Sequence, residues 1–240
     1  MKAMDVKSEH DFFLTQFKRH TRDTGRFNLS RYLGTGHPVY NVSVPERRDI
    51  VASWVKLHRD VSREDIVNLV DLLFDGKTHE EKSVASMLLG WYKKYLVTLE
   101  ERYFDQWLSK LKGWAEVDSI CDEIDLWLRA DLVNRVTMLT RWNTDAQIEK
   151  RRASLVVLCS SVRHDDRQVF SDLSFRLIDK LKAEKHVMIT KAISWLLCAL
   201  IKYHKAEVAK YMKKNISTLP KIPVREVTRK LETGKKSGKT

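Results

Sequence analysis

The sequence predicts an all-α protein, and three observations carry this prediction. Only 8 glycines and 4 prolines occur in 240 residues, which is too few for a turn-rich β fold. Nearly every segment places its apolar residues at the helical period. About a dozen such segments, joined by short loops, pair at intervals of roughly 35–40 residues. This pattern is typical of helical hairpins that stack into a curved solenoid of HEAT-like repeats, whose concave face is the natural binding surface.

The expected helices begin at recognisable residues. Pro45 stands at a first helical position, and Ser62 precedes two acidic residues as an N-cap. We expect residues 1–233 to form one repeat domain and the Lys/Gly/Ser residues 234–240 to form a basic, disordered tail. The expected helices are Asp11–His20, Leu29–Leu33, Pro45–Arg59, Ser62–Phe74, His79–Lys94, Glu100–Leu111, Trp114–Arg129, Leu132–Thr140, Asp145–Val162, Arg167–Ala183, Val187–His204, Glu207–Lys214 and a short one from Pro223.

Composition restricts the partners and the compartment. The 44 Lys+Arg exceed the 32 Asp+Glu by 12, which favours nucleic acid or an anionic surface, although a generically basic protein has the same balance. Cys121, Cys159 and Cys198 lie in apolar helical patterns without metal-ligand spacing, so we expect buried thiols in a reducing cytoplasm. The N-terminus lacks the apolar core of a signal peptide, and the apolar run Ala192–Ile201 is far shorter than the roughly 20 residues that span a bilayer. We expect a cytoplasmic protein without a membrane partner.

One helical face near the C-terminus carries an aromatic residue between cations. Lys191, Trp195 and Lys202 lie off the apolar stripe of the segment Val187–His204. Trp195 either packs on a neighbouring helix, with the lysines incidental, or forms an aromatic platform flanked by phosphate contacts.

Arg152 raises a similar question, because it falls inside an apolar stripe between Ile148 and Leu155. Arginine is almost never buried without a partner. Its guanidinium therefore either reaches out at the edge of the helix or pairs with a carboxylate or phosphate.

The middle of the chain combines a tryptophan with acids. Trp114 and Asp118 are four residues apart on a helix and share the same space, and Asp122 and Asp125 are expected on the same exposed side. This side is either a solvated acidic face or part of a site. No histidine stands at a metal-ligand offset, so we expect no metal there.

Sequence signatures of nucleotide and hydrolase chemistry are missing. The chain has no P-loop after a strand, no His-Glu-x-x-His and no Gly-x-Ser-x-Gly. We therefore expect a function that needs no cofactor.

Four segments in order resemble sequence elements of one family, the AlkD-type DNA alkylation repair glycosylases, which are built of HEAT-like repeats. The similarity covers about residues 25–215. The chain departs from the family pattern at Gly113, where the family often has a second tryptophan, and in the loop 34–40. The four segments are Ser30-Arg31-Tyr32-Leu33 with Val44-Pro45-Glu46-Arg47-Arg48, then Trp114-Ala115-Glu116-Val117-Asp118, Arg151-Arg152-Ala153-Ser154-Leu155 and Lys191-Ala192-Ile193-Ser194-Trp195.

The resemblance implies a monofunctional DNA glycosylase that acts on duplex DNA with cationic N7- or N3-alkylated purines and does not flip the lesion into a deep pocket. A carboxylate suits this reaction because positive charge grows on the sugar, and aromatic faces attract a cationic base. Two other classes stay open, a non-catalytic binder of branched or distorted DNA and a HEAT-type scaffold for proteins. The implied catalytic residues are Asp118, Trp114 and Arg152, and the implied DNA contacts are Tyr32, Trp195, Lys191 and Arg151.

Overall fold

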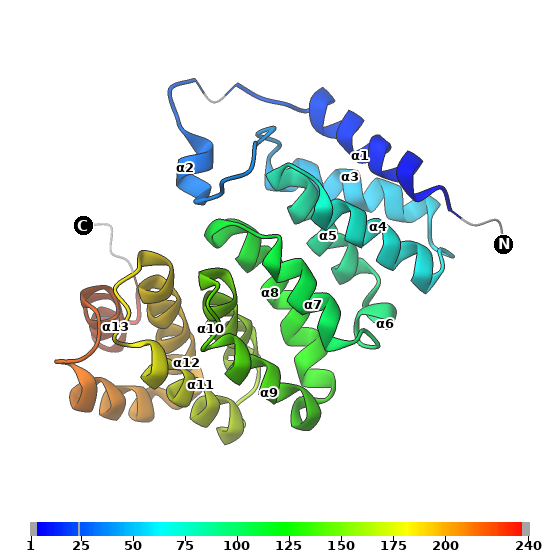
Figure 1. Cartoon of the computed structure of the whole chain (residues 1–240). Helices are drawn as coiled ribbons and strands as arrows, with labels where there is room; N and C mark the ends of the chain where they lie inside the picture. The colour runs from blue at the N-terminus through cyan, green and yellow to red at the C-terminus, as the bar shows by residue number, and fades with distance from the viewer. Residues whose placement is uncertain (1–3, 24, 237–240) are drawn as a thin grey trace. The chain divides into compact units, whose positions relative to one another are not determined.

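The computed structural model describes residues 4–23 and 25–236 (Figure 1). Within these residues the chain forms thirteen α-helices and no strand, which confirms the all-α fold class. The chain divides into two compact units, one ending at Trp127 and one beginning at Leu128, and helix α8 (Gly113–Ala130) crosses this boundary. The expectation of one domain over residues 1–233 stays a prediction. Within the expected tail, Gly234 caps the end of α13 and Lys236 pairs with Glu226 at 3.2 Å. Residues 237–240 lie outside the described residues.

The first unit is built around a helical hairpin. Helices α4 and α5 pack against each other, α1 packs on both, and α3 packs on α5. Large aromatic side chains fill this core, among them the fully buried Phe13, Phe17 and Trp54. The helices of this unit before α8 are α1 (Val6–Arg19), α2 (Leu29–Leu33), α3 (Val44–Leu57), α4 (Arg63–Asp75), α5 (His79–Trp91), α6 (Lys93–Leu96) and α7 (Glu101–Ser109).

The second unit is centred on a helix that is buried almost all round. This helix, α10, contacts α9, α11 and, most extensively, α12, and α12 also packs on α13. Cys159 and Cys198 are buried in this core, and Cys121 is buried in the first unit, as expected. The helices are α9 (Leu132–Trp142), α10 (Ile148–His164), α11 (Gln168–Leu181), α12 (Val187–Asn215) and α13 (Lys221–Thr233).

Hydrogen bonds between helices show the repeat directly. Helices two apart in the chain stack in both units, as α3 does on α5 and α10 on α12. The polar bonds between neighbouring hairpins join residues at a nearly constant separation, as stacked repeats require. Examples are Tyr92 with His58 at 34 residues, Trp107 with Asp71 at 36, Arg151 with Glu184 at 33 and Ser194 with Glu226 at 32. Each unit therefore consists of helical-hairpin repeats, and the curvature of the whole stays a prediction.

Capping residues explain where several helices begin. Ser43 and Glu46 form a capping box at α3, and Ser62 accepts the N–H of Asp65 at α4. The expected start of the first helix at Asp11 is wrong. Asp5 caps this helix by accepting the N–H of Ser8, so α1 begins five residues earlier, at Val6.

Helix α12 is long but not continuous. The sequence predicts two helices here, and the backbone of His204 is indeed non-helical, which kinks α12 at this residue. Among the described residues α12 is also the helix whose length and composition would allow it to cross a membrane, and 61% of its most apolar stretch is buried within the protein. A buried core helix passes the same test, so α12 is weak evidence for a membrane span.

Candidate active site and nucleic-acid interface

Helix α8 begins at Gly113, and any other residue at this position would strain the backbone. Gly113 has a φ of 75°, and a Cβ placed on it would lie 1.9 Å from the carbonyl oxygen of Gly34. This close approach seats the loop after α2 directly on the start of α8. The tryptophan that the family often has at this position would not fit here, which accounts for the departure at Gly113.

Aromatic side chains line this junction. The indole Nε1–H of Trp114 donates to the carbonyl oxygen of Tyr32 at 2.8 Å, and the two rings meet edge to face with centroids 5.8 Å apart. Phe27 continues the series, 5.6 Å from the Tyr32 ring. Phe27 and Tyr32 are 55% and 59% exposed, and Trp114 is half-buried. We call these three residues the aromatic row. It brings two of the expected site residues into contact and adds Phe27, which the sequence analysis missed.

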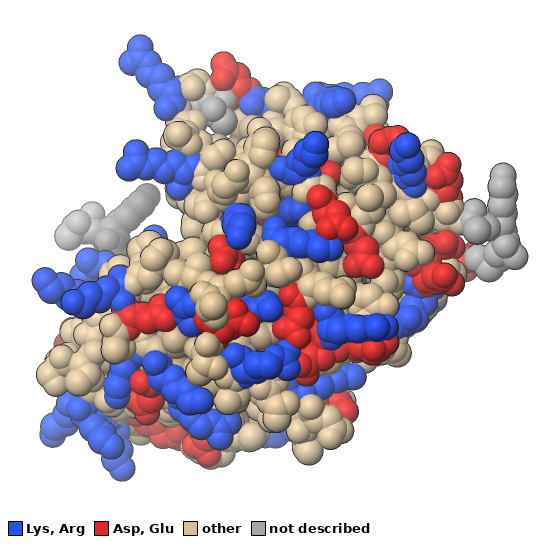
Figure 2. Space-filling view, viewed as in Figure 1, with Lys and Arg blue, Asp and Glu red and all other residues tan. Residues whose placement is uncertain are grey.

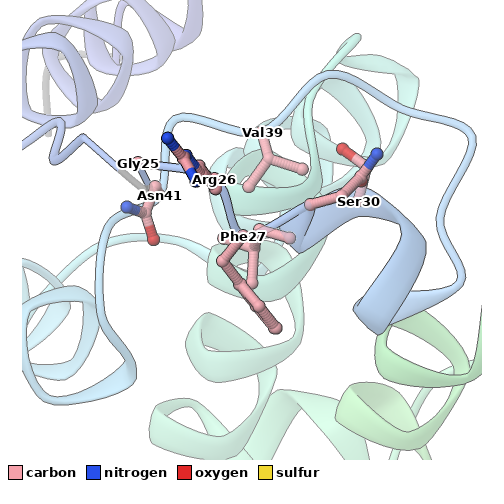
Figure 3. Close-up of a pocket in the computed structure, with 8 residues that line it drawn as sticks. Gly25, Arg26, Phe27, Ser30, Val39 and Asn41 are labelled. Carbon is pink, nitrogen blue, oxygen red and sulfur yellow. The ribbon is translucent and has the colours of Figure 1, made fainter.

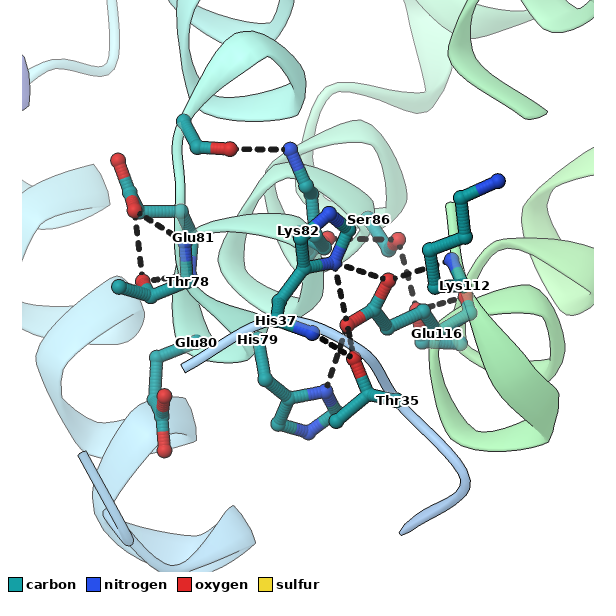
Figure 4. A network of polar contacts seen from close by, with 12 residues as sticks. Thr35, His37, Thr78, His79, Glu80, Glu81, Lys82, Ser86, Lys112 and Glu116 are labelled. Atoms are coloured by element: carbon teal, nitrogen blue, oxygen red, sulfur yellow. Dashed lines mark hydrogen bonds and ion pairs between the residues drawn. The ribbon is translucent and has the colours of Figure 1, made fainter. Parts of the chain in front are cut away.

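A buried carboxylate holds the loop on the opposite side of α8. Glu116 is fully buried and accepts hydrogen bonds from the Thr35 hydroxyl at 2.5 Å and the backbone N–H of Lys112 at 2.8 Å. The Nδ1 of His37 lies 3.0 Å from both carboxylate oxygens, and the Nδ1 of His79 lies 3.5 Å from one (Figure 4). The segment 32–37, which comprises the end of α2 and the loop after it, is thus fixed at Trp114 and at Glu116.

The charge of Glu116 is stabilised by these neighbours. Burial alone raises the pKa of a carboxyl group, but the nearby His79 ring and the hydrogen bonds from Thr35, the Lys112 N–H and His37 outweigh it and hold the pKa of Glu116 below its usual 4.5. The buried ammonium group of Lys82 donates to the carbonyl oxygens of Phe74 and Gly76. Burial lowers the pKa of Lys82, while Glu116 opposes this shift.

The acidic side of α8 is only partly as expected. Asp118 lies four residues after Trp114, on the same side of the helix, and is half-buried, and Asp122 is exposed. The expectation that Asp125 belongs to an exposed acidic face is wrong, because Asp125 is fully buried. Glu123 packs against Gly90 of α5, and burial together with the nearby Asp122 raises its pKa to about 7.

In the second unit, the expected arginines contact protein groups. Arg151 pairs with Glu184 at 2.7 Å and donates to the carbonyl oxygens of Asp145 and Ala146. Arg152 is 4% exposed, and its Nη1 donates to the carbonyl oxygen of Met188 at 2.5 Å, just inside α12. The first alternative for Arg152, a guanidinium that reaches out into solvent at the edge of the helix, is therefore excluded.

Trp195 and Lys191 lie near the start of α12. Trp195 is half-buried, and the guanidinium of Arg163 from α10 lies over its ring, 5.4 Å from the centroid. Lys202 of the same helix donates to the backbone carbonyl of Arg163 at 2.7 Å. Trp195 thus packs against a neighbouring helix and carries a cation on its face. Lys191 is exposed.

The two groups of site residues belong to different units. Tyr32, Trp114 and Asp118 lie in the first unit, and Arg151, Arg152, Lys191 and Trp195 lie in the second. Their convergence on one concave face stays a prediction. The excess of basic residues is not collected in one patch on the face in Figure 2, where Lys/Arg and Asp/Glu are interspersed. Among the described residues, no group of three His, Cys, Asp or Glu is placed to hold a metal ion.

Comparisons with known proteins agree with this architecture. The family model described as DNA alkylation repair enzyme matches residues 13–231. No curated protein matches the sequence. Three solved structures share the fold: a predicted DNA alkylation repair enzyme from Enterococcus faecalis, AlkD2 from Streptococcus mutans, and smu.31 from Streptococcus mutans UA159.

These similarities are structural, with low sequence identity. The Enterococcus protein is 18% identical with a TM-score of 0.73, over 85% of this chain and 93% of its own. AlkD2 is 15% identical with a TM-score of 0.60, over 97% of this chain and 100% of its own. The smu.31 protein is 16% identical with a TM-score of 0.51, over 79% of this chain and 90% of its own.

Proposed function

This chain belongs to the DNA alkylation repair enzyme family, and from that premise we propose that it is a monofunctional DNA glycosylase. Its substrate is duplex DNA that contains a purine alkylated at N7 or N3. The observation that carries the proposal is the junction at the start of α8, where Tyr32 and Trp114 are fixed against each other and Asp118 follows one turn later on the same side.

The chemistry of this substrate suits a carboxylate and aromatic rings. An alkylated purine carries a positive charge that weakens the glycosidic bond, so the base leaves neutral without a proton donor. Positive charge then grows on the sugar, and the Asp118 carboxylate stabilises it and orients the water that adds to the anomeric carbon. The faces of Trp114 and Tyr32 attract the cationic base before the bond breaks, and each such contact contributes about 0.5–2 kcal/mol.

The second unit supplies the expected contacts to the DNA backbone. Lys191 is exposed on α12 and free to approach a phosphate. Arg163, held over Trp195, adds a second cation near the same helix. A phosphate contact by Arg152 remains part of the proposal, although this side chain is nearly buried and already donates to Met188. The proposal further includes a monomer that works in the cytoplasm, associated with the nucleoid, without cofactor or membrane partner.

An alternative function is favoured by the environment of Trp195, because Arg163 covers the face on which a cationic base would stack. A non-catalytic relative that binds branched or distorted DNA would use the same aromatic row and cations without a catalytic carboxylate. A protein scaffold is the third alternative, and it would bind DNA without a steep dependence on salt.

The deciding experiment measures base release. The protein is incubated with a duplex that contains a single N7-methylguanine, and free base and abasic sites are quantified separately. We expect free N7-methylguanine together with one abasic site per released base and an unbroken strand, and no release from unmodified DNA. Binding without release would favour the non-catalytic alternative, and weak binding without a salt dependence would favour the scaffold.

A further inference from the structure

A shallow pocket borders the aromatic row at its exposed end. It has a volume of about 400 Å³ (Figure 3). The segment just before and within α2 forms one side of it, and the extended chain before α3 forms the other. The lining residues are Gly25, Arg26, Phe27, Asn28, Leu29, Ser30, Val39 and Asn41.

Phe27 joins this pocket to the proposed site. Its ring both lines the pocket and contacts Tyr32, and Tyr32 contacts Trp114. The ring centroids of Phe27 and Tyr32 are 5.6 Å apart, and those of Tyr32 and Trp114 are 5.8 Å apart, so a continuous series of rings connects the pocket with Trp114. Two or three stacked bases, at about 3.4 Å each, span a comparable length.

The polar groups of the pocket suit a nucleotide. Asn41 has a φ of 61°, a backbone conformation that asparagine tolerates better than most residues. Its Nδ2 donates to the carbonyl oxygen of Arg22 at 2.8 Å, which fixes the amide, while its Oδ1 has no donor among the described residues. Arg26 and Arg31 are exposed and form no ion pair with the described residues. The pocket thus offers the aromatic face of Phe27, the fixed acceptor of Asn41 and the cation of Arg26, and Arg31 follows the lining residue Ser30 in the chain.

We infer that this pocket is an accessory subsite for an unpaired nucleobase of the DNA strand near the lesion. The base stacks on Phe27, an exocyclic amino group donates to Asn41 Oδ1, and Arg26 contacts the phosphate. Stacking on an exposed aromatic ring accepts any base, so the subsite recognises the unpaired state more than the sequence. The inference rests on the proposed DNA function, but it does not require base excision.

A pair of DNA duplexes isolates the contact with the base. Both carry one extra, unpaired position, which holds a normal adenine nucleotide in one duplex and an abasic tetrahydrofuran nucleotide in the other. The backbone charge is the same in both duplexes, so a difference in affinity that depends on Phe27 reports contact with the base. We expect the wild-type protein to bind the adenine duplex at least ~5-fold more tightly, which is the lower end for stacking of one base.

Three variants and one control complete the experiment. Phe27→Ala should bind both duplexes alike, and Phe27→Trp should keep the difference. Asn41→Gly tolerates the positive φ and should reduce the difference. Trp91→Ala removes another exposed aromatic residue of the same unit and should keep it. The inference is overturned if the wild type does not distinguish the duplexes or if Phe27→Ala still does.

The outcome is separable from that of the proposed function. Loss of the difference in Phe27→Ala, in a protein that releases no N7-methylguanine, would support the subsite and refute the glycosylase. Base release by the wild type without any difference between the duplexes would do the reverse.

Discussion

The two units use the same types of residue in different ways. In the first unit, side chains from distant segments meet at the start of α8, where Trp114 and Glu116 hold the segment 32–37 from two sides. In the second unit, Lys191 is exposed, and the other residues singled out by the sequence contact protein groups. Arg151 pairs with Glu184 and Arg152 is buried against the start of α12.

The first unit therefore holds its site residues in a fixed arrangement, whereas most of the expected site residues of the second unit are already bound to protein groups. A side chain on the right face of a helix contributes to DNA binding only if its charge is not already compensated by the protein. By this criterion Lys191 is a better candidate for a phosphate contact than Arg151 or Arg152. The first unit should therefore govern chemistry, and the second should govern affinity through a few exposed cations.

Substitution of Glu116 is expected to have the largest effect on the first unit. We expect Glu116→Ala to lower the free energy of unfolding by about 3–5 kcal/mol, because it leaves the buried Lys82 and His79 without their carboxylate. The pKa of Glu116 is lowered in the folded state, so its contribution is present above pH 4.5 and is lost as the pH falls below that value. Urea unfolding of the wild type and Glu116→Ala between pH 3 and pH 7 checks this.

Asp49→Asn provides the control, since Asp49 is an exposed acid of the same unit. It should leave the free energy of unfolding within about 0.5 kcal/mol of the wild type. Equal stability of Glu116→Ala and the wild type at pH 7 would show that the segment 32–37 is not held through this carboxylate.

Glu123 gives an effect of the opposite sign. Its pKa is raised to about 7, so the folded state favours the protonated form, and stability is lost as the pH rises through 7. Glu123→Gln should therefore raise the free energy of unfolding by about 1–3 kcal/mol at pH 8 and have no effect near pH 4.5. Thermal unfolding at the two pH values measures the change. A destabilised variant at pH 8 would mean that the ionised carboxylate has a favourable partner.

Substitutions of Lys191 and Arg152 compare an exposed cation with a buried one within the second unit. Lys191→Ala should leave stability unchanged and reduce the dependence of DNA affinity on salt by about one counterion. Arg152→Ala should instead lower the free energy of unfolding by about 1–3 kcal/mol, since it removes a buried hydrogen bond. Titrations at several salt concentrations, together with unfolding curves, separate the two effects. A normal salt dependence in Lys191→Ala would remove this residue from the DNA interface.

The fold followed from the sequence because its signals are local. Helical period, scarce glycine and caps such as Ser43 and Ser62 each act within a few residues. The relation of Trp114 to Asp118 was also visible, since residues four apart share a helix face.

The network around Glu116 was not visible, because its partners come from a loop, from α5 and from the residue before α8. A signal was present in the composition of His79–Ser86, where charged residues occupy the positions that face other helices. Asp125 was misplaced for a related reason, since a helix with neighbours on two sides has no single buried stripe. Spacing alone does not tell which polar side chain will find a partner from another repeat.

The most direct test of the proposed site is the single-turnover rate at which Asp118→Asn releases N7-methylguanine from duplex DNA. We expect this variant to fold and bind DNA like the wild type, while its rate falls by roughly 10²–10³, because the amide keeps the shape and removes the charge that stabilises the sugar cation. The loss should be larger for lesions that depurinate slowly. Asp122→Asn, an exposed neighbour one turn further along α8, should retain the full rate. Release by Asp118→Asn at the wild-type rate would contradict the assignment and leave Asp118 as a surface residue.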